Sequence, residues 1–150
     1  MTQLLLSSVV RGYIFACTSA SQRECFERKL FGTSKLYGAA AIRIKKGDFL
    51  FLLNIDSDLL YGVFKAVTDG GFNIMPEAWE GKYPYQVKVE PVGETIPLKD
   101  AKKLLKKLGV DRFSLMGKAT VLKILELFRP SGVPMHDWYR FLTQTEGSAI

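Results

Sequence analysis

Runs and alternations of apolar residues predict several short strands in the first two thirds of the chain. Apolar and aromatic residues dominate 12–17 and 49–53, and a further run covers 59–67. From Tyr85 to Val92 apolar and polar residues alternate, which is the period-2 pattern of a half-buried strand. Short turns separate these segments. We therefore predict an antiparallel sheet or small barrel rather than alternating strand-helix-strand units.

The pattern changes to helical spacing in two places. Ser21 and Glu24 have the spacing of a capping box, in which the serine hydroxyl would accept from the Glu24 amide and the Glu24 carboxylate would bond back. The helix that they begin should run to about Lys29. In the last third the chain should be mainly helical over 98–143, with one helix ending at Gly109 and another over 121–128. Residues 144–150 are expected to be a frayed tail.

Lysines form one face of the first of these late helices. An apolar face lies opposite them, and the lysines are Lys99, Lys102, Lys103, Lys106 and Lys107. Such a face could bind phosphate, or it could be the ordinary solvated side of an amphipathic helix. Farther on, Trp138, Tyr139 and Phe141 either cover the domain's own core or form a patch for a protein partner.

Composition favours a single domain with a bias toward polyanions. The 150 residues are 47% hydrophobic and 24% charged, which fits one soluble globular domain over 1–150. A formal charge of +6 favours nucleic acid or other polyanions as partners, and charge alone does not choose between RNA, DNA and mere solubility. No apolar run approaches the ~18 residues of a membrane span. We therefore expect no membrane partner and a cytoplasmic location.

Residues for catalysis or metal binding are scarce. Two cysteines, Cys17 and Cys25, and one histidine, His136, do not satisfy a structural zinc site. No nucleophile elbow, phosphate-binding glycine loop or dinucleotide fingerprint is present. The expectation is a binding protein that is not an enzyme and has no metal and no cofactor.

A connection of roughly 15 residues precedes the alternating strand, and Trp79 lies at its centre. Loops of this length in compact domains are more often functional than not. The indole could close a ligand pocket, with Lys82 nearby for an anion, or it could fold back as a lid on the core. Both interpretations fit the residue types.

Several blocks of sequence, in the same order, resemble the plant development and cell death (DCD) domain over roughly residues 12–98. Ile74, Pro76, Ala78 and Trp79 belong to this resemblance as single positions. The continuous blocks are GYIFAC at 12–17, ECF at 24–26, LFG at 30–32, GDFLFL at 47–52, LYGVF at 60–64 and PYQVKV at 84–89.

The same layout is similar to the YTH and EVE domains of the PUA-like superfamily. That resemblance implies an α+β fold: a small, partly open barrel of antiparallel or mixed β-strands, flanked by helices. Members of these related families bind nucleic acid that carries a modified base, and an aromatic cage holds that base. The implied partner is RNA or single-stranded nucleic acid, with RNA favoured and a methylated base as one form of the ligand.

The resemblance also implies roles for particular residues. Phe31 is at the position of a cage tryptophan that follows the first helix in YTH domains, and Trp79 matches a second cage aromatic. Ile74 stands where YTH domains usually have another cage tryptophan. Cys17 and Thr18 end the first strand, where relatives often place an asparagine that reads the base edge. This chain departs from the pattern there, because Thr18 offers only a hydroxyl.

The resulting hypothesis is a module that holds one base between Phe31 and Trp79, with Ile74 and Met75 as the floor and Cys17 and Thr18 at the base edge. Stacking of this kind contributes ~1–3 kcal/mol per base. The predicted phosphate contacts are Lys35, Lys82, Lys45 and Lys46. The alternative function is a protein-interaction or small-ligand-sensing domain that uses the same pocket.

Overall fold

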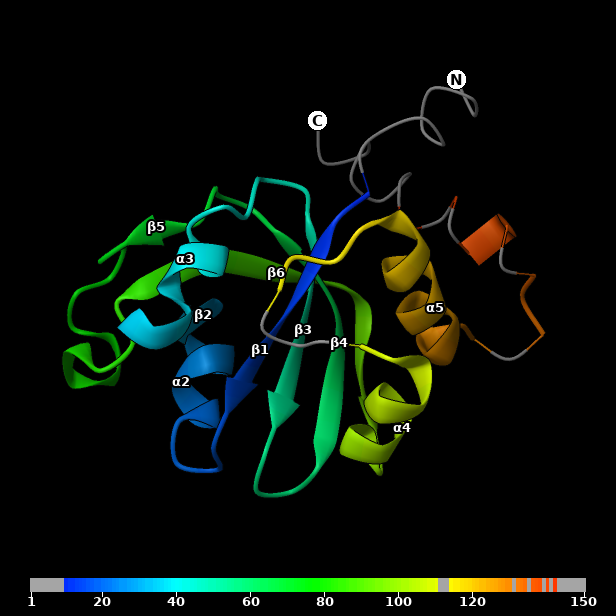
Figure 1. Cartoon of the computed structure of the whole chain (residues 1–150), viewed down its shortest axis with the longest axis horizontal. Coiled ribbons are helices and arrows are strands. Elements are labelled where there is room, and N and C mark those ends of the chain that lie inside the picture. Colours follow the sequence, from blue (N-terminus) through cyan, green and yellow to red (C-terminus); the bar gives the residue numbers. More distant parts are fainter. Residues whose placement is uncertain are drawn as a thin grey trace.

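The computed structural model describes residues 10–110, 114–130, 132–134, 136–138, 140 and 142. Within this part of the chain, strands form a single sheet whose order is β1-β3-β4-β6-β2, with β5 paired to β6 (Figure 1). The strands are β1 (Gly12–Cys17), β2 (Leu30–Thr33), β3 (Phe49–Asn54), β4 (Leu59–Ala66), β5 (Gly71–Phe72) and β6 (Tyr85–Leu98). β1 and β3 are parallel, and the other pairs are antiparallel.

The long strand β6 bends the sheet toward a barrel. Its first residues, Tyr85 to Lys88, pair with β2, whereas its later residues, from Val89 to Leu98, pair with β4. β1 and β2 are the two ends of the strand order, so the barrel stays open between them. The predicted fold class, a partly open mixed barrel flanked by helices, is confirmed.

Alternation along the strands separates two cores. Inward side chains of β1, β3 and β4 fill the barrel together with β2 and β6, and this set includes Tyr13, Phe15, Phe31, Leu50, Leu52, Phe64, Val87 and Val89. Side chains on the outer face, such as Ile14 and Phe51, form a second core under two helices. The period of two thus places neighbouring residues of one strand in different cores.

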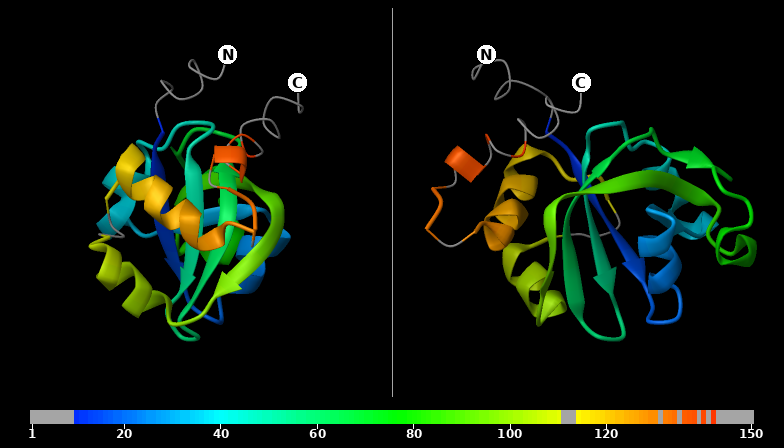
Figure 2. Two further views of the ribbon diagram at one scale, coloured as in Figure 1. Left: turned by 90° about the vertical axis from the view of Figure 1, so that its right-hand side faces the viewer. Right: turned by 180° about the vertical axis from the view of Figure 1, so that it is seen from behind.

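The outer core is covered by α4 (Ala101–Leu108) and α5 (Lys118–Phe128), which lie on the same side of the sheet (Figure 2). α4 buries Ala101 and Leu105, exposes its lysines, and ends at Gly109 with a φ of 71°. That left-handed conformation is the usual helix stop and favours glycine. Among the described residues, no helix is long and apolar enough to cross a membrane.

Shorter helices lie at the other side of the barrel. They are α2 (Gln22–Glu27), η1 (Lys35–Tyr37), α3 (Gly38–Ala41) and η2 (Ala78–Gly81). The predicted capping box on α2 is wrong, because Ser21 makes no side-chain cap bond and the Glu24 carboxylate turns to other partners. The helix also ends earlier than predicted, and Lys29 has a φ of 50°.

After α5, residues 136–138, 140 and 142 are helical. Trp138 is 6% exposed and Leu142 is 1% exposed, and both pack in the outer core. Trp138 therefore covers the domain's own core, which was one of its two predicted roles. Tyr139, Phe141 and the predicted tail at 144–150 lie outside the described residues.

Candidate functional site

A pocket of about 170 Å³ lies along the open seam of the barrel, and we call it the seam pocket. One wall is β1 and the residue after it, 13–18, and the other is residues 32–34 at the end of β2. Tyr37, Ile55 and Tyr83 complete the lining. Among the described strands β1 pairs with β3, and its other edge, which is bridged to Met116 at Gly12, faces this seam over residues 13–17. An unpaired strand edge offers backbone donors and acceptors to a ligand.

The loop before β6 covers one end of the seam and is held by Trp79. The indole is 5% exposed, and its Nε1–H donates to the Ser21 carbonyl oxygen at 3.0 Å. The ring packs against Gly32, where a Cβ atom would come within 2.6 Å of the indole. Glycine at this position of β2 therefore allows the loop to close down on the barrel.

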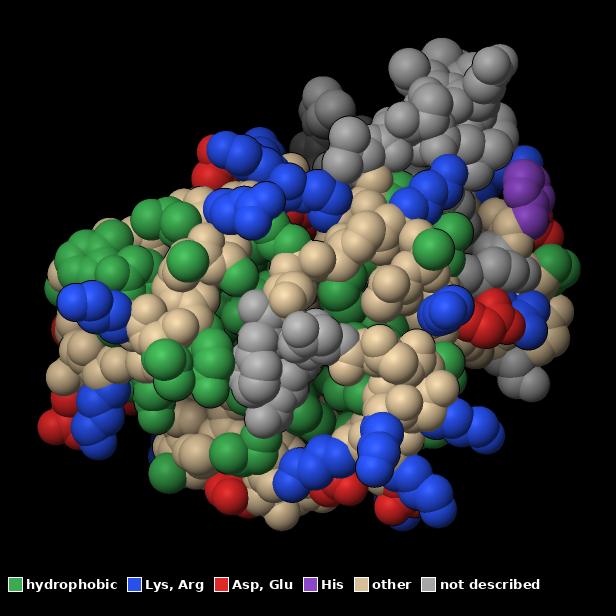
Figure 3. All heavy atoms as spheres, viewed as in Figure 1, with side chains coloured by type: hydrophobic (Ala, Val, Ile, Leu, Met, Phe, Trp, Pro, Cys, Tyr) green, Lys and Arg blue, Asp and Glu red, His purple; other side chains and the backbone are tan. Residues whose placement is uncertain are grey.

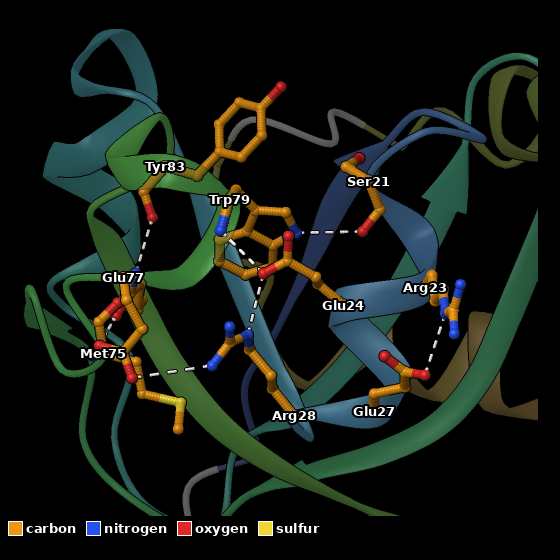
Figure 4. A network of polar contacts seen from close by, with 10 residues as sticks. Ser21, Arg23, Glu24, Glu27, Arg28, Met75, Glu77, Trp79 and Tyr83 are labelled. Carbon is orange, nitrogen blue, oxygen red and sulfur yellow. Dashed lines mark hydrogen bonds and ion pairs between the residues drawn. The ribbon is translucent and has the colours of Figure 1, made fainter.

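Glu24 on α2 holds the same loop through a hydrogen bond to the loop backbone. Its Oε2 accepts from the Trp79 N–H at 2.8 Å and from the Arg28 Nε at 2.9 Å (Figure 4). Arg28 also lies 3.7 Å from the Glu77 carboxylate of the loop. The hydrogen bond from Trp79, opposed by partial burial and assisted by Arg28, lowers the pKa of Glu24 below its ordinary value.

Gln86 fixes the other side of the loop. Its side chain is 1% exposed although it lies on the polar side of the predicted alternation. Oε1 accepts from the Met75 N–H at 2.7 Å, and Nε2 donates to the Met75 and Tyr83 carbonyl oxygens at 3.1 and 3.0 Å. One side-chain amide thus bonds to three backbone groups of the loop. Through one of these bonds it fixes the backbone position of the pocket residue Tyr83.

The two cysteines are free thiols that are buried near the seam. Cys17 lines the pocket. A hydrogen bond between the two thiols, together with burial, raises the pKa of Cys25 far above its ordinary value. Among the described residues, no group of three potential ligands could hold a metal ion.

The structure brings together only part of the predicted base pocket. Cys17 and Thr18 line the seam pocket. Phe31 is 0% exposed, and its ring packs against Phe15 and Phe64 inside the barrel. With Trp79 also buried, neither predicted stacking ring presents an open face to a base. Of the two predicted roles of Trp79, its buried position fits the one in which the indole folds back as a lid on the core.

Ile74 and Met75 do not line the seam pocket. Both are half-buried and pack against the barrel core from the loop, outside the lining of the seam pocket. Their predicted contact with a base therefore has no counterpart in this pocket.

The predicted phosphate-binding lysines fall into two groups. Lys35 and Lys82 are exposed and are adjacent in sequence to the pocket residues Ser34 and Tyr83. Lys45 and Lys46 are exposed at the turn between α3 and β3, where the Lys46 N–H donates to Asp69. None of the four lysines lines the seam pocket, and the first pair is connected to it by its neighbours in sequence.

Tyr37 and Tyr83 are the pocket aromatics that the sequence did not single out. Both are half-buried, and the Tyr83 ring meets the Trp79 ring edge-on at a centroid distance of 5.7 Å. In Figure 4 the Tyr83 side chain points away from the buried polar network beneath Trp79. The available signal was its place in the same long loop, directly after Lys82.

A pH experiment tests the bond between Glu24 and the loop. A carboxyl whose pKa is lowered on folding adds stability above its unfolded pKa, near 4.5, and this stability is lost as the pH falls through the lower folded pKa. We expect Glu24→Gln to reduce stability at pH 7 and the difference from the unmodified protein to shrink below about pH 4.5. Urea midpoints from pH 7 to pH 3 measure it.

The matched control is Glu27→Gln, which removes a carboxylate of the same helix that accepts from exposed Arg23 rather than from Trp79. A difference between Glu24→Gln and the unmodified protein that stays constant down to pH 3 would contradict the proposed linkage. The same is true if Glu27→Gln reproduces the pH profile.

Comparison with known proteins identifies relatives in plants. The chain is 40% identical to the B2 protein of Daucus carota over 90 residues, which are 55% of this chain and 44% of that protein. It is 30% identical to the DCD domain-containing protein NRP of Arabidopsis thaliana over 132 residues, which are 81% of this chain and 38% of that protein. The chain therefore spans less than half the length of these relatives.

Solved structures with the same fold include YTH domains. The Pho92 YTH domain in complex with m6A has a TM-score of 0.62 at 16% identity, over 81% of this chain and 85% of that one. The YTH domain of Zygosaccharomyces rouxii MRB1, in complex with N6-methyladenosine RNA, has a TM-score of 0.59 at 11% identity, over 81% and 88%.

The family assignment rests on the sequence. The sequence profile of the Development and cell death domain matches residues 11–128, which include every strand of the barrel, α4 and α5. The predicted resemblance is confirmed, and this chain belongs to the Development and cell death domain family.

Proposed function

We propose that this domain binds single-stranded RNA and holds one splayed base in the seam pocket. The observation that carries the proposal is the pocket itself, which lies along residues 13–18 and has Tyr37 and Tyr83 in its lining. Its volume of about 170 Å³ is below the ~300–1,000 Å³ of pockets for drug-sized ligands. A single planar group is the ligand of matching size.

The lining has the chemistry that a base requires. Tyr37 and Tyr83 supply ring surface for stacking, and Ile55 adds apolar contact. The hydroxyls of Thr33 and Ser34, with backbone groups at the end of β1, can bond to the base edge. In this proposal Tyr37 and Tyr83 take the stacking role that the sequence predicted for Phe31 and Trp79. The rings of Phe31 and Trp79 are buried in the barrel core.

Charge around the pocket supports a nucleic-acid ligand. Lys35 and Lys82 are exposed beside residues of its rim, and the whole chain carries +6. The YTH domains of the same fold include complexes with m6A and with N6-methyladenosine RNA. These observations favour RNA, and a methylated adenine is the modified base to test first. The domain then acts by binding and performs no catalysis.

Tyr83→Ala should weaken binding of a short single-stranded RNA by roughly 5- to 150-fold. The reason is that base stacking on an aromatic ring contributes about 1–3 kcal/mol. Tyr83→Phe should keep most of the affinity because it retains the ring. Fluorescence anisotropy of labelled RNA, with and without one N6-methyladenosine, measures the change at two salt concentrations.

The control is Phe72→Ala, which removes an aromatic ring that is 57% exposed and does not line the pocket. It should change the affinity by less than about twofold. Equal losses for Tyr83→Ala and Phe72→Ala would contradict the pocket assignment. If no RNA or DNA oligonucleotide binds at low salt, where counterion release favours association most, the nucleic-acid function itself is refuted.

A further inference from the structure

A second pocket adjoins the seam pocket, and we call it the Arg43 pocket. Its volume is about 410 Å³, and it is lined by Leu36, Tyr37, Ala39, Ala40, Arg43, Ser114 and Leu115. Tyr37 lines both pockets, so the two lie on either side of this residue or beside it. η1 and α3 supply most of the second pocket because these two short helices follow each other directly.

An exposed apolar side chain marks this pocket. Leu36 is 78% exposed, the highest value among the large hydrophobic residues that the structure leaves at the surface. Isolated surface leucines are common and need no explanation. This one lines a pocket that shares Tyr37 with a candidate base site, so it offers an apolar surface to a neighbouring group.

The charge beside this surface is positive. Arg11 donates to the Asp48 carboxylate at 2.8 Å and to the Arg43 carbonyl oxygen, so its own charge is offset. The Arg43 guanidinium is exposed, and none of the described carboxylates lies within ion-pair distance of it. Figure 3 shows lysine and arginine side chains gathered over the turn between α3 and β3, where Lys45 and Lys46 lie.

We propose that the Arg43 pocket holds the nucleotide next to the base in the seam pocket, with Arg43 on its phosphate and Leu36 against its base. The inference rests on the proposed RNA-binding function. It extends that function by giving the bound RNA a path, from the seam pocket across Tyr37 to the Arg43 pocket. It also gives Lys45 and Lys46 a place, as cations for the phosphates that follow. Because no carboxylate of the described residues pairs with the Arg43 guanidinium, it is suited to this contact.

Arg43→Gln separates the two pockets experimentally. It should lower the affinity for a short single-stranded RNA by about 5- to 10-fold and reduce the salt slope by about 0.7 for one lost phosphate contact. Binding of the single nucleoside adenosine or N6-methyladenosine, followed by NMR, should stay unchanged. The Arg43 carbonyl that accepts from Arg11 belongs to the backbone, so the substitution leaves that bond in place.

Two further variants make the test specific. Lys123→Gln removes one charge from an exposed position of α5 and should change the RNA affinity by less than about twofold. Leu36→Ser should lower the RNA affinity by roughly 2- to 5-fold through lost apolar contact, without changing the salt slope. Thermal unfolding of each variant confirms that the fold is intact.

Four results would overturn the inference. They are unchanged RNA affinity in Arg43→Gln, an equal loss in Lys123→Gln, no effect of Leu36→Ser, or weaker nucleoside binding in Arg43→Gln. If the nucleoside still binds while one of these results is found, the proposed function stands and only the second subsite is refuted. If neither nucleoside nor RNA binds the unmodified protein, both proposals fail together.

Discussion

Trp79→Ala is expected to lower the free energy of unfolding by about 3–5 kcal/mol, the usual cost of truncating a large buried aromatic side chain. The indole is 5% exposed, packs on Gly32 and donates to the Ser21 carbonyl oxygen. Its removal leaves a cavity under the loop and leaves the Ser21 carbonyl oxygen with the longer hydrogen bond from the Cys25 N–H, at 3.5 Å. Equilibrium unfolding in urea, followed by circular dichroism, measures the difference.

Two comparisons isolate the contributions. Trp79→Phe keeps an aromatic ring in the site but loses the bond to Ser21, so it should cost less than the alanine variant. Phe72→Ala removes a ring that is 57% exposed on neighbouring β5 and should cost less than about 1 kcal/mol. If Trp79→Ala costs no more than Phe72→Ala, the indole is not a core residue, and the predicted stacking role regains its basis.

The expected loss of stability on truncating a buried ring determines which variants can test the site. Alanine at both Phe31 and Trp79 would remove two buried rings and so report on folding before it reported on a base. A ring that borders the pocket without filling the core is the better probe. Tyr83 meets this condition because it is half-buried and lines the seam pocket.

Local patterns were sufficient for β1, β3, β4 and the first part of β6. The alternation of Val87 and Val89 with polar residues, for example, reflects burial against one core, which a period of two reveals directly. β2 was missed because it has only four residues and owes its strand conformation to pairing with β6, as in Leu30 with Lys88. Such distant pairing is invisible to a local window.

The site was predicted in part for the same reason. Cys17 and Thr18 line the pocket because the end of a strand is a local feature that the sequence locates. The position of Phe31 depends on which face of β2 points into the barrel, and that is set by its pairing opposite Val87. Tyr37 and Tyr83 become neighbours of β1 only when η1 and the long loop fold against the open seam.

Gln86 shows the limit of periodicity most clearly. An alternating strand predicts that this position faces water, yet the loop folds over it and leaves the side chain 1% exposed. The amide is retained there because Met75 and Tyr83 present backbone groups that need partners. Burial of this kind depends on the path of the loop and not on the strand.

Gln86→Leu should therefore lower the free energy of unfolding by about 2–4 kcal/mol. Leucine fills a similar space but removes the partner of the Met75 N–H and of the Tyr83 carbonyl oxygen, whereas the Met75 carbonyl oxygen keeps the Ala78 N–H, and each orphaned buried group costs about 1–3 kcal/mol. The loop can recover part of this cost by moving toward water. Urea unfolding gives the stability, and RNA titration of the folded variant gives the effect on the site.

The two measurements together test whether the loop builds the pocket. Movement of the loop displaces Tyr83, so the folded Gln86→Leu protein should also bind RNA more weakly than the unmodified protein. Glu94→Leu makes a comparable polar-to-apolar change at an exposed position of β6 and should alter stability by no more than about 0.5 kcal/mol. A Gln86→Leu protein that is destabilised yet binds RNA with full affinity would show that the position of Tyr83 does not govern binding, because the pocket would then tolerate a displaced loop.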